Sequence, residues 1–559
     1  MTRRLLLAVA VQMVLLTGVF GQTAPATYRI AFTDKTNTPY TIDHPEAYLG
    51  QRSIERRQQQ GIPIDPFDLP VDPAYVDALL ASGQFELMYC SKWTNSVTIH
   101  STDTLALDTI DQLPFVASVR LLADGRPHSD RRGDKFRTPV SKGGISGPYE
   151  PLYGESFRQI EMLNGHLLHA AGAMGQGMRI GVLDSGFDHA DSLPAFADLF
   201  ARNGVVMTED VVDEDGDVYH DHWHGRTVLS CLAGHVDGHL LGSAPEADYV
   251  LVRTENAASE YIVEEDNWVR GAELCDSLGC DVLNTSLGYT TFDDSLQDHD
   301  YADMDGMTTR ISIAASIAAS RGMVVVVSAG NSGAGAWHYI GAPADAAGVL
   351  AVGAVGPDRV TASFSSRGPS SDGRVKPDVA AVGFQAYGLG IDGSRVDPIN
   401  GTSFSSPVLA GGVTCLWQLH PDRTAAEVRD AVIRSASRYS APDSATGYGI
   451  PDLWRAHLLL NGRDLTGLSG TQFMEIAPVP FTDHFELVLF TGGADRLDVR
   501  LYGPEGRMTW EASKPLDPGT YQRLWLGDPA LAALSAGVYV LDAVIGSAHL
   551  RRSLVKAEQ

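Results

Sequence analysis

The chain has 559 residues, too many for one compact domain, and its length predicts about two to four structural units. Hydrophobic residues make up 44% of the sequence, which is enough to build packed cores and excludes wholesale disorder. With 69 acidic and 42 basic residues the formal net charge is −27. A surface of this sign repels phosphate backbones and argues against a nucleic-acid-binding protein.

The first 22 residues have the pattern of a secretory signal peptide. Arg3 and Arg4 precede an apolar stretch, and small residues follow near Gly21. A short membrane anchor is the alternative, but the apolar stretch is short for a span and ends in a cleavage-like site. No later segment approaches the roughly 20 apolar residues of a membrane helix. We therefore expect residues 1–22 to direct export and the mature chain to carry no transmembrane segment.

Residues 23–125 are expected to form a small α+β domain. Strand-like runs at 28–32, 96–100 and 115–122 accompany a charged, helix-like run at 51–60. The next residues, 126–154, are rich in Arg, Lys, Gly, Pro and Ser. That composition is typical of a linker that proteases can reach.

Residues 155–462 alternate short apolar runs with amphipathic segments. The expected strands are 179–184, 248–253, 281–287, 323–329 and 349–355, with helices between them such as 267–279 and 308–322. Strands that are apolar on both faces and separated by helices predict an α/β fold with a parallel sheet covered on both sides, a three-layer arrangement. Such sheets bind ligands beyond the carboxyl ends of their strands.

Residues 466–559 show a different pattern. Runs at 485–490, 498–503, 523–527 and 537–545 alternate polar and apolar residues between Gly and Pro turns. This period of two predicts a C-terminal β-sandwich.

Five cysteines in a chain of this length do not make a disulfide scaffold. Cys275 and Cys280 flank an expected turn and could pair, although buried free thiols fit the sequence equally well. The state of Cys231 and Cys415 is left open.

Two polar residues stand at the ends of buried strands. Asp184 ends the run 179–184, and Asn331 follows the run 323–329 between two glycines. Each has an ordinary structural interpretation, the first as a strand-end cap and the second as a turn asparagine. Each would also face the crevice where an α/β sheet binds ligands.

Two further residues stand at expected helix starts. His224 precedes Gly225 and a run of small residues, and Ser403 lies just after Gly401 at the start of a tightly packed apolar helix. Backbone N–H groups at a helix start are unpaired and carry partial positive charge, so a serine there has anion-stabilising donors beside it.

Two stretches of the sequence contain residues that could bind a metal. His220, His222 and His224 alternate, but no H-E-x-x-H motif and no cysteine ligand spacing accompanies them. The acidic run 213–217 lacks EF-hand spacing and is better interpreted as a solvated turn. No metal is expected to take part in the chemistry, while structural calcium is possible.

The order Asp184, His224, Ser403, with spacings of 40 and 179 residues, is the chain order of the subtilisin triad. The segments "VLDSG", "HG" before "VLSCLAG", "NTSLG", "SAGNSG", "FSSRGPSSDGRVKPDVAAVG" and "GTSFSSP" are together highly specific. On these motifs, residues 155–460 resemble the subtilisin-like (subtilase, S8) serine peptidases.

The resemblance implies a role for each matching residue. Ser403 would be the nucleophile, His224 the general base and Asp184 the group that orients and stabilises the imidazolium. Asn331 would help to hold the oxyanion. Residues Ser286, Leu287 and Gly288 would pair with the backbone of an extended substrate.

One position departs from the family pattern, because Arg226 stands where the usual motif "HGT" has threonine. Since that threonine is not a triad member, we expect altered packing rather than inactivity.

The flanking regions resemble known companions of this domain. Residues 23–125, notably "FTDKTNTPY" and "SKWTNSVTI", resemble the N-terminal propeptides of Bacteroidetes-type subtilases, which act as intramolecular chaperones and inhibitors. Segments such as "APVPF", "LYGPEGR" and "LSAGVYVL" resemble a type IX secretion sorting domain, with "PVP" where "PNP" is usual.

The sequence thus predicts a serine endopeptidase made as a precursor and located outside the cell, free or attached to its surface. Its partners would be protein or peptide substrates, its own propeptide and the type IX secretion machinery. A catalytically silent subtilase fold used for binding or adhesion is the alternative. A serine esterase is disfavoured because no G-x-S-x-G elbow occurs.

Overall fold

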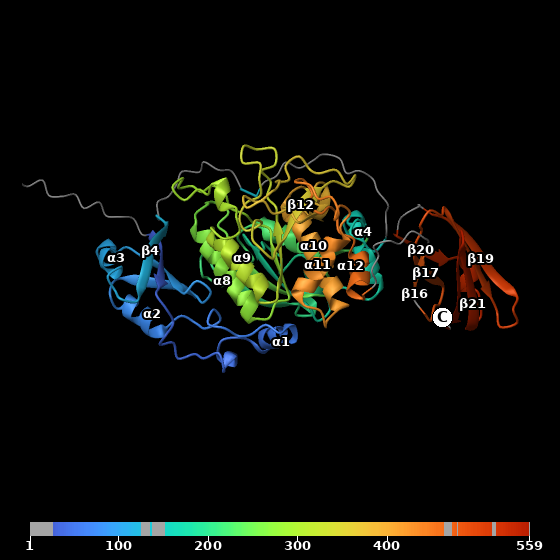
Figure 1. The fold of residues 1–559 in the computed structure, drawn as a ribbon, viewed down its shortest axis with the longest axis horizontal. Helices are drawn as coiled ribbons and strands as arrows, with labels where there is room; N and C mark the ends of the chain where they lie inside the picture. The colour runs from blue at the N-terminus through green and yellow to red at the C-terminus, as the bar shows by residue number, and fades with distance from the viewer. Residues whose placement is uncertain are drawn as a thin grey trace, which may run out of the picture.

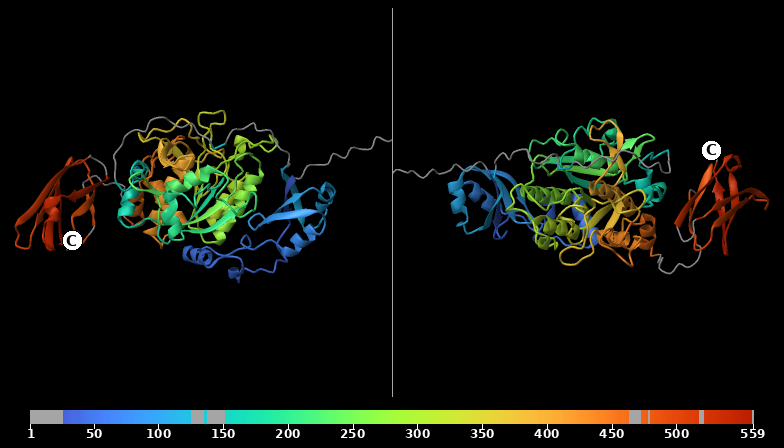
Figure 2. Two further views of the ribbon diagram at one scale, coloured as in Figure 1. Left: turned by 180° about the vertical axis from the view of Figure 1, so that it is seen from behind. Right: turned by 90° about the horizontal axis from the view of Figure 1, so that it is seen from above.

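The computed structural model describes residues 26–124, 135–136, 151–462, 472–477, 479–516 and 521–557. The expected signal peptide and most of the expected linker lie outside these residues. Three folded parts follow one another along the long axis of the molecule (Figure 1). The N-terminal and C-terminal parts lie at opposite ends of the central part in the other two views as well (Figure 2).

The N-terminal part is an α+β domain, as expected. Its four antiparallel strands lie in the order β2-β3-β1-β4. The expected helix 51–60 coincides with α1. The elements are β1 (Ala26–Phe32), α1 (Gln51–Gln60), α2 (Pro73–Leu80), β2 (Phe85–Ser91), β3 (Ser96–Ser101), α3 (Thr104–Ile110) and β4 (Val116–Ala123).

The central part contains a sheet of seven parallel strands in the order β13-β12-β11-β10-β5-β9-β6. This confirms the expected α/β fold with a parallel sheet. The strands are β5 (Arg179–Asp184), β6 (Val205–Asp210), β9 (Asp248–Arg253), β10 (Val282–Thr285), β11 (Val324–Ser328), β12 (Leu350–Val355) and β13 (Val379–Val382).

Alternate residues of each central strand enter two different cores. In β11, Val324 and Val326 belong to one core, whereas Val325 and Val327 belong to the other. Successive side chains of a strand point to opposite faces, so the interior strands of this sheet are buried on both sides and are largely apolar.

Helices cover both faces and give three layers (Figure 1). One core includes side chains of α8 (Val263–Ser277) and α9 (Arg310–Ser320), and the other includes those of α7 (Trp223–Ala233), α10 (Thr402–Gln418), α11 (Ala425–Ser435) and α12 (Leu453–Leu460). Helix α8 starts four residues before the expected position 267. Glu264, Glu265 and Asp266 occupy its first turn, where negative side chains interact favourably with the positive end of the helix dipole. The smaller elements are α4 (Phe157–Glu161), α5 (Gly165–Ala170), α6 (Ala197–Ala201), β7 (His235–Val236), β8 (Leu240–Leu241), β14 (Ala386–Leu389) and β15 (Val396–Ile399).

The C-terminal part consists of two antiparallel sheets, β16-β17-β20 and β19-β18-β21-β22. Leu487 from one sheet and Val499 and Leu541 from the other share one hydrophobic core, as in a β-sandwich. The elements are β16 (Gln472–Ala477), β17 (His484–Phe490), β18 (Arg496–Tyr502), β19 (Met508–Pro515), β20 (Tyr521–Gly527), α13 (Pro529–Ala532), β21 (Gly537–Ile545) and β22 (Ala548–Lys556).

The N-terminal domain packs against α8 through buried charges. Asp276 is fully buried and accepts hydrogen bonds from Arg56 at 2.6 Å, Arg57 at 2.8 Å and Lys92 at 3.0 Å. Burial alone would raise the pKa of this carboxyl, but Lys92, Arg57 and Arg56 outweigh it and lower the pKa below that of an ordinary aspartate. The contact between the two domains therefore depends on a charged network.

The five cysteines all fall within the described residues and are free thiols, with Cys231, Cys275, Cys280 and Cys415 buried. This agrees with the free-thiol interpretation of Cys275 and Cys280. Among the described residues, we find no helix with the length and apolar character required to span a bilayer.

Candidate active site

Asp184 is the last residue of β5 and is completely buried. Its Oδ1 atom lies 2.7 Å from His224 Nδ1 and accepts a hydrogen bond from the Ser185 amide at 2.8 Å. A carboxylate bound to Nδ1 holds the ring so that Nε2 faces away from it. The strand end therefore fixes the orientation of the imidazole.

His224 is the second residue of α7, and Gly225 lets this helix approach the end of β5. A Cβ atom at Gly225 would lie 2.3 Å from the Gly186 carbonyl oxygen and 2.9 Å from Asp184 Cβ. No larger residue fits at this point. The glycine after His224 is therefore a packing requirement of the site itself.

The neighbouring histidines have other partners. His222 Nδ1 contacts the Ser185 hydroxyl at 2.9 Å, and His220 contacts Asp217 at 3.0 Å. Within the described ranges, the cluster of ligand atoms close enough to hold a metal is Glu255, Glu260 and Glu264, and it contains no histidine.

Ser403 lies in the first turn of α10. Gly401 precedes this helix with φ of 149°, a conformation that favours glycine. The Ser403 hydroxyl donates to the Ser286 carbonyl at 3.3 Å, and the described residues show no hydrogen bond between Ser403 and His224. The ring of Phe404, the next residue, lies 5.8 Å from the His224 ring, so the starts of α7 and α10 are neighbours.

Asn331 follows β11 and reaches the same helix start. Its Oδ1 accepts hydrogen bonds from the Thr402 amide at 2.9 Å and the Thr402 hydroxyl at 3.1 Å. Because the amide N–H of Thr402 can only donate, it fixes Oδ1 toward α10 and turns the Nδ2 donor of Asn331 to the other side.

A cavity of about 200 Å³ brings most of the predicted residues together. It is lined by Ser286, Leu287, Gly288, Asn331 and Ser403. The first three follow β10, Asn331 follows β11 and Ser403 begins α10. The cavity thus lies at the carboxyl ends of adjacent parallel strands.

The cavity is also lined by residues that the sequence analysis did not predict, among them Lys135, Phe136, Glu255 and Glu260. The Phe136 ring lies over His224 with 4.3 Å between ring centroids. Residues 135–136 belong to the expected linker, whose composition carries no periodic pattern. In the sequence, the acidic residues between 255 and 266 were the one feature that could have indicated this part of the cavity.

Arg226 is buried and joins the segment after β5 to the segment after β14. It donates to the Asp188 carbonyl and carboxylate, each at 3.1 Å, and to the carbonyls of Gly390 at 3.0 Å and Ile391 at 2.5 Å. These bonds explain why an arginine is accommodated beside His224 and Gly225, and they leave the Asp184–His224 hydrogen bond intact.

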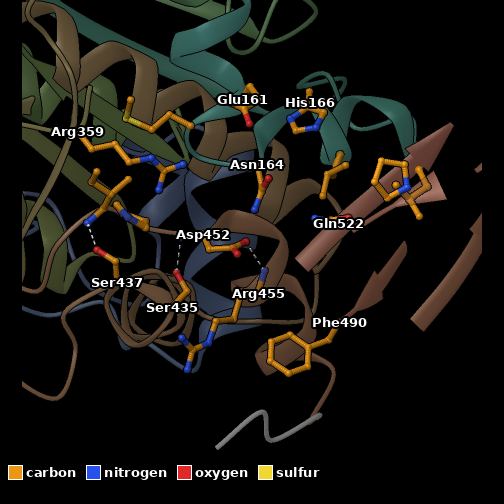
Figure 3. A pocket seen from close by; sticks show the side chains of 16 residues that line it. Glu161, Asn164, His166, Arg359, Ser435, Ser437, Asp452, Arg455, Phe490 and Gln522 are labelled. Carbon is orange, nitrogen blue, oxygen red and sulfur yellow. Dashed lines mark hydrogen bonds between the residues drawn. The ribbon is translucent and has the colours of Figure 1, made fainter. Parts of the chain in front are cut away.

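A larger cavity, of about 800 Å³, lies elsewhere, between the central part and the C-terminal sandwich. Figure 3 shows Asn164, His166 and Asp452 of the central part on one side and Phe490 and Gln522 of the sandwich on the other. None of the predicted site residues lines it.

Comparison with known proteins identifies two domains. Residues 175–449 match the Subtilase family, peptidase S8, and residues 27–134 match the Peptidase S8 propeptide domain of Bacteroidota. The chain therefore contains a subtilase domain preceded by an S8 propeptide domain. The domain boundaries expected from the sequence stay predictions.

Individual relatives agree with this. The chain is 29% identical to subtilisin E of Bacillus subtilis (strain 168) over 282 residues, which are 50% of this chain and 65% of that protein. It is 28% identical to serine protease AprX of the same organism over 300 residues, 48% of this chain and 63% of that protein. The match thus spans just under two thirds of these relatives.

The crystal structure of MycP1 from Mycobacterium smegmatis aligns with a TM-score of 0.42 at 22% identity, covering 54% of this chain and 84% of that one.

Proposed function

We propose that the protein is a serine endopeptidase that uses Ser403, His224 and Asp184. The observation that carries this proposal is the 2.7 Å bond from His224 to the buried Asp184, formed beside a cavity that Ser403 and Asn331 line. The similarity to named subtilisins and serine proteases supports the same reaction class.

In the proposed reaction, the Ser403 hydroxyl attacks a peptide carbonyl while His224 Nε2 accepts its proton. A rotation about the Cα–Cβ bond of Ser403 redirects the hydroxyl from Ser286 toward His224, since such bonds often tighten only when substrate binds. Asp184 stabilises the imidazolium that forms. His224 then gives its proton to the leaving amine, and water hydrolyses the acyl-enzyme.

The oxyanion of the tetrahedral intermediate would be held by Asn331 Nδ2 and the backbone N–H of Ser403. The second donor is one of the unpaired amides at the start of α10. The backbone of residues 286–288, along the same cavity, would pair with an extended substrate.

A fluorophosphonate probe tests the nucleophile. After activation, the wild-type protein should label at Ser403, and the Ser403→Ala variant should not. A wild type that stays unlabelled after removal of the N-terminal domain would favour the alternative, a silent subtilase fold used for binding.

We further propose that the protein is made as a precursor and exported. Residues 1–22 would be the signal peptide, residues 23–125 an intramolecular chaperone and inhibitor, and residues 466–559 a type IX sorting domain. The mature enzyme would be extracellular or attached to the cell surface. Mass spectrometry that finds residues 23–125 still covalently attached in the active enzyme would contradict the precursor model.

A further inference from the structure

Three glutamates form a buried acidic cluster beside the cavity of Ser403. Glu255 follows β9, Glu260 lies in the next loop and Glu264 begins α8, and one oxygen of each lies within 4.8 Å of the others. Their side chains are 2%, 13% and 2% exposed. Glu255 and Glu260 also line the cavity itself.

Such a cluster is costly without a cation, because carboxylates repel one another and lose their hydration on burial. Neutral donors satisfy only part of this cluster: Glu255 accepts from the Tyr289 hydroxyl and, at 3.4 Å, from the Thr254 hydroxyl, and Glu264 accepts from the Asn256 amide at 3.1 Å. Burial raises the pKa of Glu264 well above its usual value and that of Glu260 to about 7. The site therefore favours either a proton or a positive group.

The chain places an ammonium group there. Lys135 Nζ lies 2.7 Å from Glu264, 3.3 Å from Glu260 and 3.4 Å from Glu255, and it donates to the Ser259 carbonyl at 3.0 Å. Its three donors serve Glu264, Glu255 and the Ser259 carbonyl, and Glu260 lies beside them as an ion-pair partner. The next residue, Phe136, covers the ring of His224. A peptide segment that crosses the cavity in this way therefore places one side chain over His224 and the adjacent side chain among the three glutamates.

We propose that Glu255, Glu260 and Glu264 form a specificity pocket that selects substrates with a lysine or arginine side chain. This inference rests on the proposed peptidase function and names its substrate class. In the precursor, Lys135 occupies the place that the substrate's basic side chain takes in the mature enzyme. A neutral side chain would leave three buried carboxylates without a counter-charge, and an acidic one would add a fourth.

The test uses the protein expressed at full length and then activated, together with a peptide library. One position at a time around the scissile bond carries Lys, Arg, norleucine, Gln or Glu, and kcat/KM is measured for each peptide. At one position we expect Lys and Arg to exceed norleucine by about ten- to one-hundred-fold, the factor given by one charge-assisted hydrogen bond. The Glu264→Gln and Glu260→Gln variants should lower this ratio by about ten-fold or more.

The control variant Glu505→Gln, in an exposed turn of the sandwich, should keep the wild-type ratio. Hydrolysis without preference for basic side chains at any position would overturn this inference and leave the proposed function standing. Hydrolysis of no peptide at all would remove the proposed function, and this inference with it. Thermal stabilisation by calcium chloride that is lost in Glu264→Gln, together with an unselective library, would show a metal site instead and overturn the pocket.

Discussion

The side-chain hydroxyl of Ser286 donates a 2.8 Å hydrogen bond to the backbone carbonyl of Ser403. That carbonyl would normally accept from the amide four residues later, but position 407 is a proline and has no N–H. Ser286 replaces the missing donor and, through its own carbonyl, also accepts the Ser403 hydroxyl. The segment after β10 thus holds the first turn of α10 in place.

Replacing Ser286 with alanine should therefore disturb both stability and activity. The buried Ser403 carbonyl would lose its donor, at a cost of about 1–3 kcal/mol in the free energy of unfolding. We expect a lower Tm and a fall in kcat, with partial recovery in Ser286→Thr, which keeps the hydroxyl. The control is Ser320→Ala, which removes a comparable bond on the surface of α9. Equal effects of the two alanine variants would contradict the role given to Ser286.

Asn331→Asp separates two functions of one side chain. Aspartate keeps an acceptor for the Thr402 amide but replaces the Nδ2 donor by a negative oxygen, which would repel an oxyanion. We expect kcat to fall by at least about 10²–10³-fold, the cost of losing such a donor in subtilisin. Because Thr402 keeps its partner, KM and Tm should change little. A variant that retained wild-type kcat would remove Asn331 from the proposed oxyanion site.

Much of this fold could be predicted because its strands are buried on both faces. Runs 179–184 and 248–253 coincide with β5 and β9. Strand β6 was missed because it lies at the sheet edge, with Val206 and Met207 exposed and acidic residues at its end. Strand β13 was missed because its four residues end a segment rich in Ser, Gly and Pro that has no strand pattern of its own.

The residues of the candidate site also include some that could be predicted from the sequence and some that could not. The positions of Asp184, Asn331 and Ser403 could be predicted, because each ends or follows a strand or lies in the first turn of a helix, where a parallel sheet places its ligand groups. The contacts of Lys135 with the three glutamates could not be predicted, since they span 120 residues or more and join a linker to a loop and the first turn of α8. Spacing carries no information about such contacts until the fold is known.

Asp276 should control how firmly the N-terminal domain is held. In Asp276→Asn, Arg56 and Lys92 lose a buried counter-charge, and breaking such a network costs about 3–5 kcal/mol. On a Ser403→Ala background, which would prevent processing, we expect faster hydrogen exchange in residues 51–60. The exposed pair of Asp430 with Arg434 supplies the control, Asp430→Asn, with little effect.

The pH dependence of the same contact follows from the lowered pKa of Asp276. Its contribution is complete above the usual pKa range of aspartate and is lost only as the pH falls through the lowered value. The N-terminal domain should therefore stay protected from exchange at pH 5. Loss of protection between pH 6 and 5 would show that other groups control the contact.

Selectivity for basic side chains should rise with pH around neutrality. With Lys135 in place, the pKa of Glu260 is raised to about 7, mainly by burial, while Lys135 lowers it and Glu255 raises it further; a bound substrate lysine would put the same charge there. Below that pH the carboxyl is protonated and the pocket, which also contains Glu264, loses negative charge; above it the charge returns. The ratio of kcat/KM for matched lysine and norleucine peptides should therefore increase from pH 6 to pH 8. Taking the ratio cancels the protonation of the proposed general base, because both peptides need it equally. In Glu260→Gln the rise should be reduced, and a ratio constant over this range in the wild type would exclude Glu260 as the group that sets selectivity.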